Sequence, residues 1–369
     1  MHQATPTLIL SRSAIQRTVV HFGIDAVVDR LVGRLTEVLR HHDPTRSVTP
    51  ARSGFSYATP RPGLVEWMPI HEVGRDVTIK VVGYHPENPA AYSIPTIVST
   101  ISAYDTTTGH LSCLMDGVLP TALRTAAATV VASRILARPD SSTLGLIGCG
   151  AQAVAHVHAL CRFFPITRIL FYDTDPAARG SLARRCAAFG TGARFVEAPV
   201  ADVVTQSDIL LTATSVDVGA GPLFGDLPHR PHLHVNAIGS DFPGKTELPL
   251  DLLHRAYVCP DFPDQARVEG ECQRLAPEAI GDDITVLCRR PADYRHLQDR
   301  LTVYDSTGWS LQDQVVLRLL SELAAELGLG QYIEIENMRG DASNPYDFQP
   351  DAQAPTVRRP ETQPHEYPA

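Results

Sequence analysis

The sequence predicts an α/β protein in which a doubly wound parallel sheet is joined to a second, α+β domain. Three observations predict this fold class. The chain has 369 residues, which exceeds one ordinary small domain. From Ser142 onward, short apolar strands alternate with helices. Most of these strands are apolar throughout, which is typical of strands buried on both faces of a parallel sheet.

The composition excludes several classes of protein. Apolar residues make up 44% of the chain and charged residues 20%, which is enough for a buried core and excludes wholesale disorder. The 32 basic and 41 acidic residues give a net charge of −9, so we expect no nucleic-acid partner, because phosphate binding needs a basic surface. No apolar run approaches the roughly 18 residues of a membrane helix, so no membrane partner is expected.

The cysteines and the N-terminus indicate the compartment. Seven widely spaced cysteines, an odd number without a C-x-x-C pair, predict neither a disulfide framework nor a zinc site. Residues 1–12 lack the charged and apolar regions of a secretion signal. We therefore expect a cytoplasmic protein.

The N-terminal part of the chain mixes helical and strand patterns. Apolar side chains at helical spacing predict an amphipathic helix over residues 24–42. Residues 46–69 are expected to be irregular, because prolines and Gly63 interrupt them. Strands are predicted over residues 77–84, 96–104 and 111–116. An alanine-rich helix is predicted over residues 121–138, where Pro139 stops it.

The second half of the chain carries the parallel-sheet pattern. Its predicted strands are residues 143–147, 168–172, 209–214, 233–239 and 301–305. An apolar stripe predicts a helix over residues 311–327. After Gly340 the chain becomes polar and proline-rich, and residues 351–369 are predicted to be a disordered tail.

A glycine turn follows the first of these strands and opens a helix, which is the arrangement of a Rossmann-type nucleotide-binding domain. Gly148 permits the tight turn, and Gly150 lets the backbone approach a pyrophosphate because it has no Cβ. The free N–H groups at the helix start, around Ala151 and Gln152, then bind the phosphates. A glycine-rich turn in an unrelated α/β sheet is the structural alternative.

The acid at the end of the next strand indicates which dinucleotide binds. Asp173 lies 25 positions after Gly148, where a carboxylate can accept hydrogen bonds from ribose hydroxyls and repels a 2′-phosphate. NAD is therefore favoured over NADP. Arg179 is nearby but displaced from the strand end, and it leaves NADP open.

Several motifs in one order resemble the ornithine cyclodeaminase/μ-crystallin family over about residues 8–350. They are Lys80 on a strand, residues 121–127 at a helix start, the glycine turn, and residues 212–215, 237–241 with 243–248, and 305–308. Residues 66–69, 83–89, 136–140 and 340–346 look like the bacterial lysine cyclodeaminase subgroup of that family.

The resemblance implies a homodimer of two-domain subunits. The Rossmann NAD-binding domain would cover residues 133–317. The α+β substrate-binding and dimerisation domain would combine residues 1–132 with 318–350.

The resemblance also implies a redox cycle without net oxidation. Hydride leaves Cα of a diamino acid for NAD, the distal amine attacks the resulting iminium carbon, ammonia leaves, and the hydride returns to the cyclic imine. Such a cycle needs a clamp for the α-carboxylate, a proton shuttle and a dry pocket.

The residues that match these needs are expected to form the site. Arg52, Lys80 and Arg124 are cations outside the nucleotide-binding half and are assigned to the substrate carboxylate. By resemblance, Asp241 is the general acid/base, and Glu66 contacts a substrate amino group.

Other family positions are expected to line the same site. Thr307 matches a position that contacts substrate. The matches to positions that contact NAD, together with Arg124 and Asp241, are Thr96, Thr214, Ile238, Gly239, Lys245 and Ser306.

Each assignment has a simpler alternative. Arg52 and Lys80 could be surface charges, and Asp241 could cap the turn before Pro243. Glu66 could be a loop acid, and Thr214 a β-branched strand residue. His229, His232 and His234 could suggest a metal site. We do not favour one, because neighbouring positions on a strand point to opposite faces and no acidic residue is spaced as a further metal ligand. We therefore expect no bound metal.

The favoured function is conversion of L-lysine to L-pipecolate and ammonia by a NAD-dependent cyclodeaminase. The alternatives are an ornithine cyclodeaminase that forms L-proline, an amino-acid or cyclic-imine oxidoreductase of the same fold, and a non-catalytic binding protein like the μ-crystallins. Lysine and ornithine differ by one methylene, which is worth only about 1–3 kcal/mol in a pocket.

Overall fold

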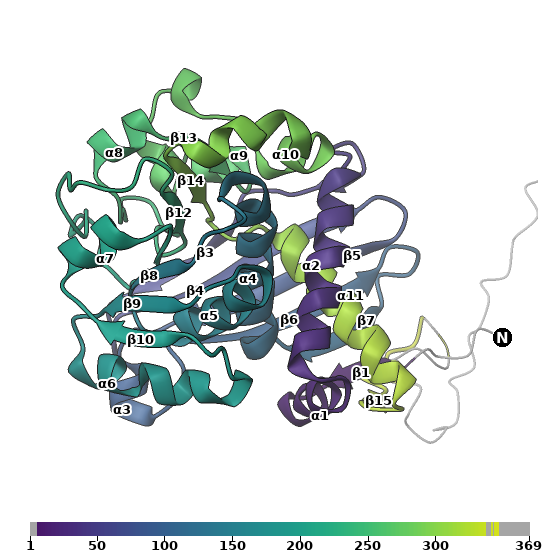
Figure 1. The fold of residues 1–369 in the computed structure, drawn as a ribbon. Coiled ribbons are helices and arrows are strands. Elements are labelled where there is room, and N and C mark those ends of the chain that lie inside the picture. Colours follow the sequence, from purple (N-terminus) through teal and green to yellow (C-terminus); the bar gives the residue numbers. More distant parts are fainter. Residues whose placement is uncertain (1–5, 337–340, 342, 347–369) are drawn as a thin grey trace, which may run out of the picture.

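The computed structural model describes residues 6–336, 341 and 343–346. Two β-sheets form its centre, and Figure 1 shows the helices packed around them. The predicted combination of a parallel, doubly wound sheet with an α+β part is confirmed. The predicted tail at residues 351–369 lies outside the described residues, and the domain ranges stay a prediction.

The first sheet has eight strands in the order β15-β1-β7-β6-β5-β4-β2, with β3 also paired to β4. Neighbouring strands are antiparallel except β1 and β7, which run parallel. The strands are β1 (Thr7–Leu10), β2 (Ser47–Val48), β3 (Ser53–Tyr57), β4 (Gly63–Glu72), β5 (Asp76–Tyr84), β6 (Ile97–Asp105), β7 (Leu111–Asp116) and β15 (Gln331–Ile333).

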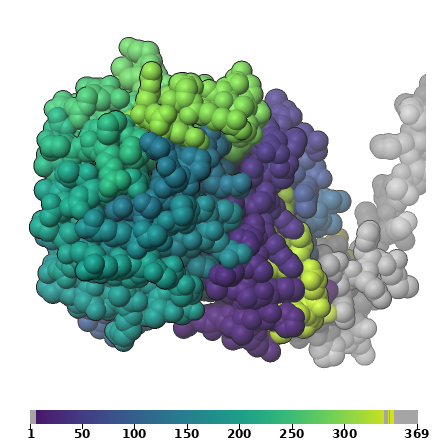
Figure 2. All heavy atoms as spheres, in the orientation of Figure 1, coloured from purple at the N-terminus to yellow at the C-terminus, as the bar shows by residue number. Residues whose placement is uncertain are grey.

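Three helices, α1 (Arg12–Phe22), α4 (Val118–Leu136) and α11 (Ser310–Glu326), contact the strands of this sheet, and a fourth, α2 (Ile24–Arg40), packs on α4 and α11. The short α3 (Asn88–Tyr92) follows β5. Helices α2 and α11 lie side by side in Figure 2 and contact each other. Helix α4 packs against α2, α5 and α11, and its buried Ala126, Ala127 and Ala128 allow this close approach.

The second sheet is entirely parallel, in the order β10-β9-β8-β11-β12-β14-β13. The strand order reverses beside β8, which is where doubly wound folds bind ligands. Its strands are β8 (Thr143–Ile147), β9 (Arg168–Tyr172), β10 (Arg194–Glu197), β11 (Ile209–Thr212), β12 (His234–Ala237), β13 (Tyr257–Pro260) and β14 (Thr302–Asp305).

Around the second sheet, helices α5 and α6 are longer than the helices that follow them. The helices of this part are α5 (Ala151–Phe163), α6 (Pro176–Cys186), α7 (Val200–Gln206), α8 (Leu250–Arg255), α9 (Pro263–Ala266) and α10 (Ile284–Arg289). Short 3-10 helices occupy η1 (Ala187–Phe189), η2 (Glu271–Arg274) and η3 (Pro277–Ala279), and a longer one occupies η4 (Pro291–Asp299).

The sequence-based assignment was wrong for residues 46–69. This segment contains β2, β3 and the start of β4 rather than irregular chain. Pro69 lies opposite Ile79 of β5, but on the other side of β4 residues 68–70 lie between the segments that pair with β2 and β3, so on that side no strand needs a hydrogen bond from Pro69. Strands β10 and β13 were also missed. They lie at the two edges of the second sheet, where the apolar pattern is weaker.

The helices of the described residues were searched for membrane spans. None of them combines the length and the apolar character that crossing a membrane requires.

Candidate active site

The predicted cofactor residues meet at one edge of the second sheet. Ile147, Thr212, Ala237 and Asp305 lie in one register row at the carboxyl ends of β8, β11, β12 and β14. Directly after these strand ends come the predicted site residues, which are Gly148, Thr214, Ile238, Gly239, Asp241, Ser306 and Thr307. This is the edge at which open α/β sheets bind ligands.

The glycine turn leaves space for a ligand. Gly148 has φ +100°, and a Cβ there would lie 2.4 Å from the Ala213 carbonyl oxygen, so the turn requires glycine. Gly150 precedes α5 and has no atom within 4 Å of its missing Cβ. The N-terminus of α5, at Ala151 and Gln152, receives no side-chain cap, so its N–H groups are available to an anion.

Asp173 lies against the same turn. Its Oδ2 accepts a hydrogen bond from the backbone N–H of Cys149 at 2.6 Å. Arg179, which left NADP open in the sequence, pairs through Nε with Glu197 at 2.7 Å and donates to the Asp173 carbonyl. Its charge is therefore already matched by a neighbouring carboxylate.

A buried carboxylate holds the strand ends in place. Glu247 accepts hydrogen bonds from the N–H and hydroxyl of Thr214, at 2.8 and 2.7 Å, and from the N–H of Gly239 at 2.9 Å. Burial raises the pKa of this carboxyl, and the same hydrogen bonds act to lower it. The Thr214 hydroxyl and the Gly239 amide are thus directed by Glu247, which we had not predicted as a site residue.

Lys80 and Arg124 share one carboxylate. Lys80 Nζ on β5 lies 2.9 Å from Asp313 Oδ2 on α11, and Arg124 Nε on α4 lies 3.1 Å from Asp313 Oδ1. Gln312 also accepts a hydrogen bond from Arg124 at 2.8 Å. Burial, then repulsion by Arg124, lowers the pKa of Lys80 to about 8. Neither cation is a surface charge: Lys80 is 2% and Arg124 6% exposed.

Arg52 joins two further carboxylates to this group. Its Nε lies 2.9 Å from Glu269 Oε1, and its Nη1 donates to Glu66 Oε1 at 3.2 Å. Its Nη2 donates to the backbone carbonyls of Thr307 and Gly308. The guanidinium therefore connects the first sheet to the carboxyl edge of the second.

Asp241 faces this cluster. Its Oδ1 accepts a hydrogen bond from Lys245 Nζ at 2.9 Å, and Lys245 lies 5.0 Å from the centre of the Tyr84 ring. Burial raises the pKa of Glu66, Arg52 opposes that rise, and the negative charge of Asp241 adds to it. Asp241 and Glu66 are therefore electrostatic neighbours. Arg52, Asp241 and Lys80 thus all lie close enough for their charges to act on Glu66.

The Asp261 carboxylate contacts the hydroxyl groups of Ser306 and Thr307. The Thr307 hydroxyl donates to Asp261 Oδ1 at 3.0 Å and accepts from Gln265 Nε2 at 2.8 Å, while the Ser306 hydroxyl reaches Asp261 Oδ2 at 3.4 Å. The next residue, Gly308, has φ +86°, and a Cβ there would lie 3.0 Å from both terminal nitrogens of Arg124.

Thr96 lies directly before β6, next to the end of β5. Its carbonyl oxygen accepts a hydrogen bond from the N–H of His85 at 2.8 Å, beside Tyr84. Its match to a family position that contacts NAD stays a prediction.

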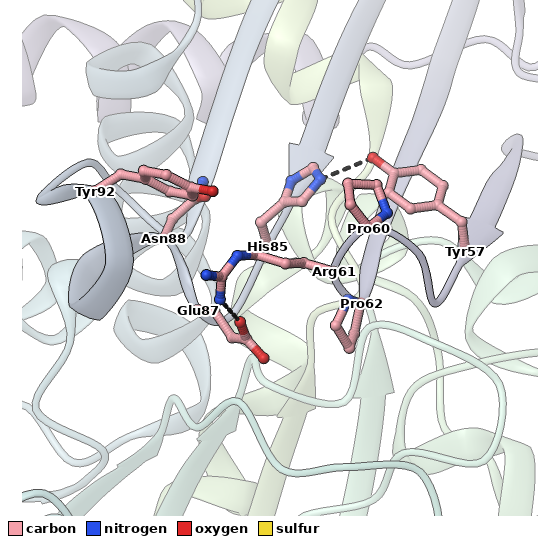
Figure 3. Close-up of a pocket in the computed structure, with 8 residues that line it drawn as sticks. All are labelled: Tyr57, Pro60, Arg61, Pro62, His85, Glu87, Asn88 and Tyr92. Carbon is pink, nitrogen blue, oxygen red and sulfur yellow. Dashed lines mark hydrogen bonds and ion pairs between the residues drawn. The ribbon is translucent and has the colours of Figure 1, made fainter.

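A pocket of about 310 Å³ is lined in part by His85. Figure 3 shows Tyr57 bonded to His85 on one side and Arg61 paired with Glu87 on the other, with Tyr92 beyond them. None of these residues was predicted as part of a site.

The three histidines that could suggest a metal site bond to separate partners. His229 bonds to the Arg230 carbonyl, His232 to Asp208 and His234 to Thr302. Burial lowers the pKa of His234 to about 3, so it is a neutral core residue. Among the residues that the structure describes, no group of three or more His, Cys, Asp or Glu side chains is arranged to hold a metal ion.

The fold and the site define a dinucleotide-binding α/β protein with a cluster of buried charges at the ligand edge. Residues 13–327 match the model of the ornithine cyclodeaminase/mu-crystallin family, and the chain belongs to this family. The resemblance found in the sequence is thereby confirmed.

Two curated relatives cover most of the chain. L-lysine cyclodeaminase of Streptomyces rapamycinicus is 41% identical over 348 residues, which is 93% of this chain and 99% of that protein. Ornithine cyclodeaminase of Agrobacterium fabrum is 32% identical over 309 residues, 82% of this chain and 83% of that protein.

Two solved structures have the same fold. A lysine cyclodeaminase, described with its recognition of L-lysine, L-ornithine and L-2,4-diaminobutyric acid, is 48% identical with a TM-score of 0.89, covering 93% of this chain and 100% of that one. An archaeal alanine dehydrogenase dimer with bound NAD is 28% identical with a TM-score of 0.78, covering 89% and 99%.

Proposed function

We propose that this protein is a NAD-dependent cyclodeaminase that converts L-lysine into L-pipecolate and ammonia. The observation that carries the proposal is the set of charged side chains at the carboxyl edge of the second sheet: Arg52 paired with Glu66, Lys80 and Arg124 on Asp313, and Asp241, whose charge acts on Glu66. The 41% identity to a lysine cyclodeaminase over nearly the whole chain supports the choice of reaction and substrate.

The residues around the glycine turn fit NAD. Gly148, Gly150, Ala151 and Gln152 would hold the pyrophosphate, because the turn is open and the α5 amides are uncapped. Asp173 would bind the ribose hydroxyls. When bound, NAD supplies a hydride acceptor that later returns the same hydride. The pairing of Arg179 with Glu197 favours NAD over NADP, since this cation is not free for a 2′-phosphate.

The remaining cofactor contacts would come from both sides of the site. Thr214, Ile238, Gly239 and Ser306 follow strand ends of the second sheet, and Thr96 and Arg124 belong to the other half of the chain. Lys245 would contact the cofactor while it orients Asp241.

Lys80 and Arg124 would bind the α-carboxylate of the substrate. Lys80 and Arg124 carry two positive charges, and the Asp313 carboxylate that both contact neutralises only one of them. One positive charge is therefore available to a ligand. Because these charges are buried, an anion that pairs with them gains more than it would in water. Arg52 and Thr307 would bind the same end of the substrate, although Arg52 already contacts two carboxylates and two carbonyls.

Asp241 and Glu66 would move the protons. Asp241 takes a proton from the α-ammonium group, so that Cα can lose hydride and become an iminium carbon. The distal amine attacks this carbon, its extra proton passes to the α-nitrogen, and that nitrogen leaves as ammonia. The hydride then returns to the cyclic imine, so no net oxidation occurs. Glu66 would hold the α-amino group, because its carboxylate is bonded to Arg52 and the charge of Asp241 acts on it.

A homodimer would form through the outer face of the first sheet. Helices α4 and α11 cover its inner face, while apolar side chains line the outer one. These are Phe55, Val65, Trp67, Ile79, Val81 and Val98, of which Phe55 is 69% exposed. An apolar patch on a sheet face is typical of a protein interface. All seven cysteines are free thiols, which supports a cytoplasmic location.

Product analysis tests the proposed reaction. The protein is incubated with catalytic NAD and either L-lysine or L-ornithine, and ammonia, NADH and the cyclic amino acid are measured. We expect ammonia and pipecolate from lysine without accumulation of NADH. NADH formed in step with ammonia would instead indicate an oxidoreductase of the same fold. Faster formation of proline from ornithine would indicate the ornithine enzyme, a reaction that several relatives are named for.

A further inference from the structure

Glu269 is a buried carboxylate at the site that the proposed reaction has not yet used. Its side chain is 4% exposed, and its Oε1 lies 2.9 Å from Arg52 Nε. That contact lacks the geometry of a hydrogen bond, and Oε1 accepts no other within the described residues. A carboxylate buried with an unfilled acceptor has a strong preference for a cationic ligand.

The loop that carries Glu269 is fixed from several sides. Its N–H donates to the Gln265 carbonyl at 3.0 Å. Gly270 follows with φ +81°, and a Cβ there would lie 2.6 Å from Thr307 Cγ2. The carboxylate of Asp305 then accepts the N–H groups of Glu271 and Cys272 at 2.9 and 2.8 Å. The position of Glu269 is therefore set by the end of β14, which also sets Thr307.

The charges in the site form two groups of opposite sign. At one end, Lys80 and Arg124 face only Asp313, which leaves one positive charge. Next to this group, three acids meet only two cations: Arg52 contacts Glu66 and Glu269, and Lys245 pairs with Asp241. Arg52 lies at the boundary, where it would also meet the α-carboxylate, and the acids beyond it favour a cationic group. A diamino acid has the matching distribution, with its carboxylate at one end and an ammonium group at the other.

Glu269 belongs to the far end of this distribution. The charges that act most strongly on Glu269 are those of Arg52, Glu66, Asp241 and Asp261, whereas Glu66 also responds to Lys80. The charge of Lys80, at the carboxylate end, therefore acts on Glu66. Burial first, opposed by the attraction of Arg52 and assisted by the repulsion of Glu66 and Asp241, raises the pKa of Glu269 to about 8 in the ligand-free site. An ammonium group bound beside the carboxyl lowers this pKa, so Glu269 is ionised, and able to accept a proton, when the substrate is bound.

Resting on the cyclodeaminase function proposed above, we propose that Glu269 binds the distal ammonium group of the diamino acid and accepts its proton. The distal nitrogen cannot attack the iminium carbon until an N–H bond breaks and its electron pair is free. The proton moves to the Glu269 carboxylate and returns to the released ammonia or to the ring nitrogen. Protons and charge therefore balance over the cycle.

L-Norleucine tests this role because it has the chain length of lysine and lacks the distal nitrogen. Dissociation constants for lysine and norleucine are measured with NADH bound, so that no hydride can leave the substrate. For Glu269→Gln we expect lysine binding to weaken at least tenfold and norleucine binding to change less than twofold. An equal loss for both ligands would mean that Glu269 only positions Arg52, and would overturn the proposal. The exposed Glu278→Gln is the matched control.

The partial reaction separates this inference from the function itself. If the wild-type protein releases no ammonia from lysine or ornithine, the proposed function fails. If it does, E269Q should lose ammonia release from lysine at least a hundredfold, and this loss should exceed any loss of NADH formation from norleucine at least tenfold. Wild-type ammonia release by E269Q would contradict the role of Glu269.

A shorter acid covers the case in which E269Q does not fold. Glu269→Asp keeps the negative charge but moves it back by one methylene. The longer substrate then reaches the carboxylate better than the shorter one, so the ratio of kcat/KM for lysine to that for ornithine should rise. An unchanged or lower ratio would place the distal amine elsewhere.

Discussion

Lys80 is a buried cation whose replacement should change stability and substrate binding in opposite directions. Burial, followed by the repulsion of Arg124, lowers its pKa from 10.5 to about 8. At pH 7 the Lys80 ammonium is charged in both the folded and the unfolded protein, but the folded protein binds its proton less tightly. The charged side chain therefore lowers the free energy of unfolding. The difference between the two pKa values corresponds to roughly 3 kcal/mol of lost stability. The attraction of Asp313 is already included, because it raises this pKa.

The sign of the pH dependence follows from proton binding. Between pH 8 and 10.5 the unfolded chain binds more protons at this position than the folded protein does, so wild-type stability should rise with pH across this window. Lys80→Met removes the charge and keeps a side chain of similar shape. We expect K80M to be more stable than wild type by as much as about 3 kcal/mol at pH 7 and by only about 1 kcal/mol at pH 10.

Urea unfolding of both proteins at pH 7 and pH 10 measures this difference. The exposed Arg194 on β10 gives the control R194M, for which we expect no change. The same K80M variant should bind lysine more weakly by about 1.5–3 kcal/mol, roughly 10- to 150-fold in KM, because a charge-assisted hydrogen bond is lost. A K80M protein that is less stable than wild type at pH 7 would refute the reasoning.

Three other variants test the remaining parts of the account. Asp241→Asn should keep NAD affinity within about threefold and abolish ammonia release, and normal turnover would remove Asp241 as the acid/base. Gly148→Ala places a Cβ 2.4 Å from the Ala213 carbonyl oxygen, so it should lower both thermal stability and NAD affinity in calorimetry; unchanged values would contradict the tight turn. Val81→Lys puts a charge on the outer face of the first sheet and should yield monomers in analytical ultracentrifugation, whereas an intact dimer would place the interface elsewhere.

The nucleotide-binding half was predictable because its signals are local. The glycine turn, the apolar strands and Asp173 follow one another within a short stretch of chain, and each has one structural use. The edge strands β10 and β13 and the Pro69-containing β4 were not predictable in this way. Their formation depends on the pairing partner, which local composition does not reveal.

The charged site was predictable only in part. The cations and Asp241 were found through family motifs, while Asp313, Glu247 and Glu269 were not. Asp313 is a polar position in the first turn of α11, and this pattern is equally typical of a solvated acid that favours the helix dipole. Its role becomes visible only when β5 and α4 bring two cations to it. Glu269 lies in a loop without periodicity, so only the fold could place it beside Arg52.

The central claim is that the hydride removed from Cα returns to the same carbon. L-Lysine deuterated at Cα, incubated with the protein and catalytic NAD, tests it directly when the product is examined by mass spectrometry. The account predicts pipecolate that retains the deuterium at its α-carbon, with one ammonia released per turnover. Pipecolate without deuterium, or deuterium accumulating in free reduced cofactor, would contradict it.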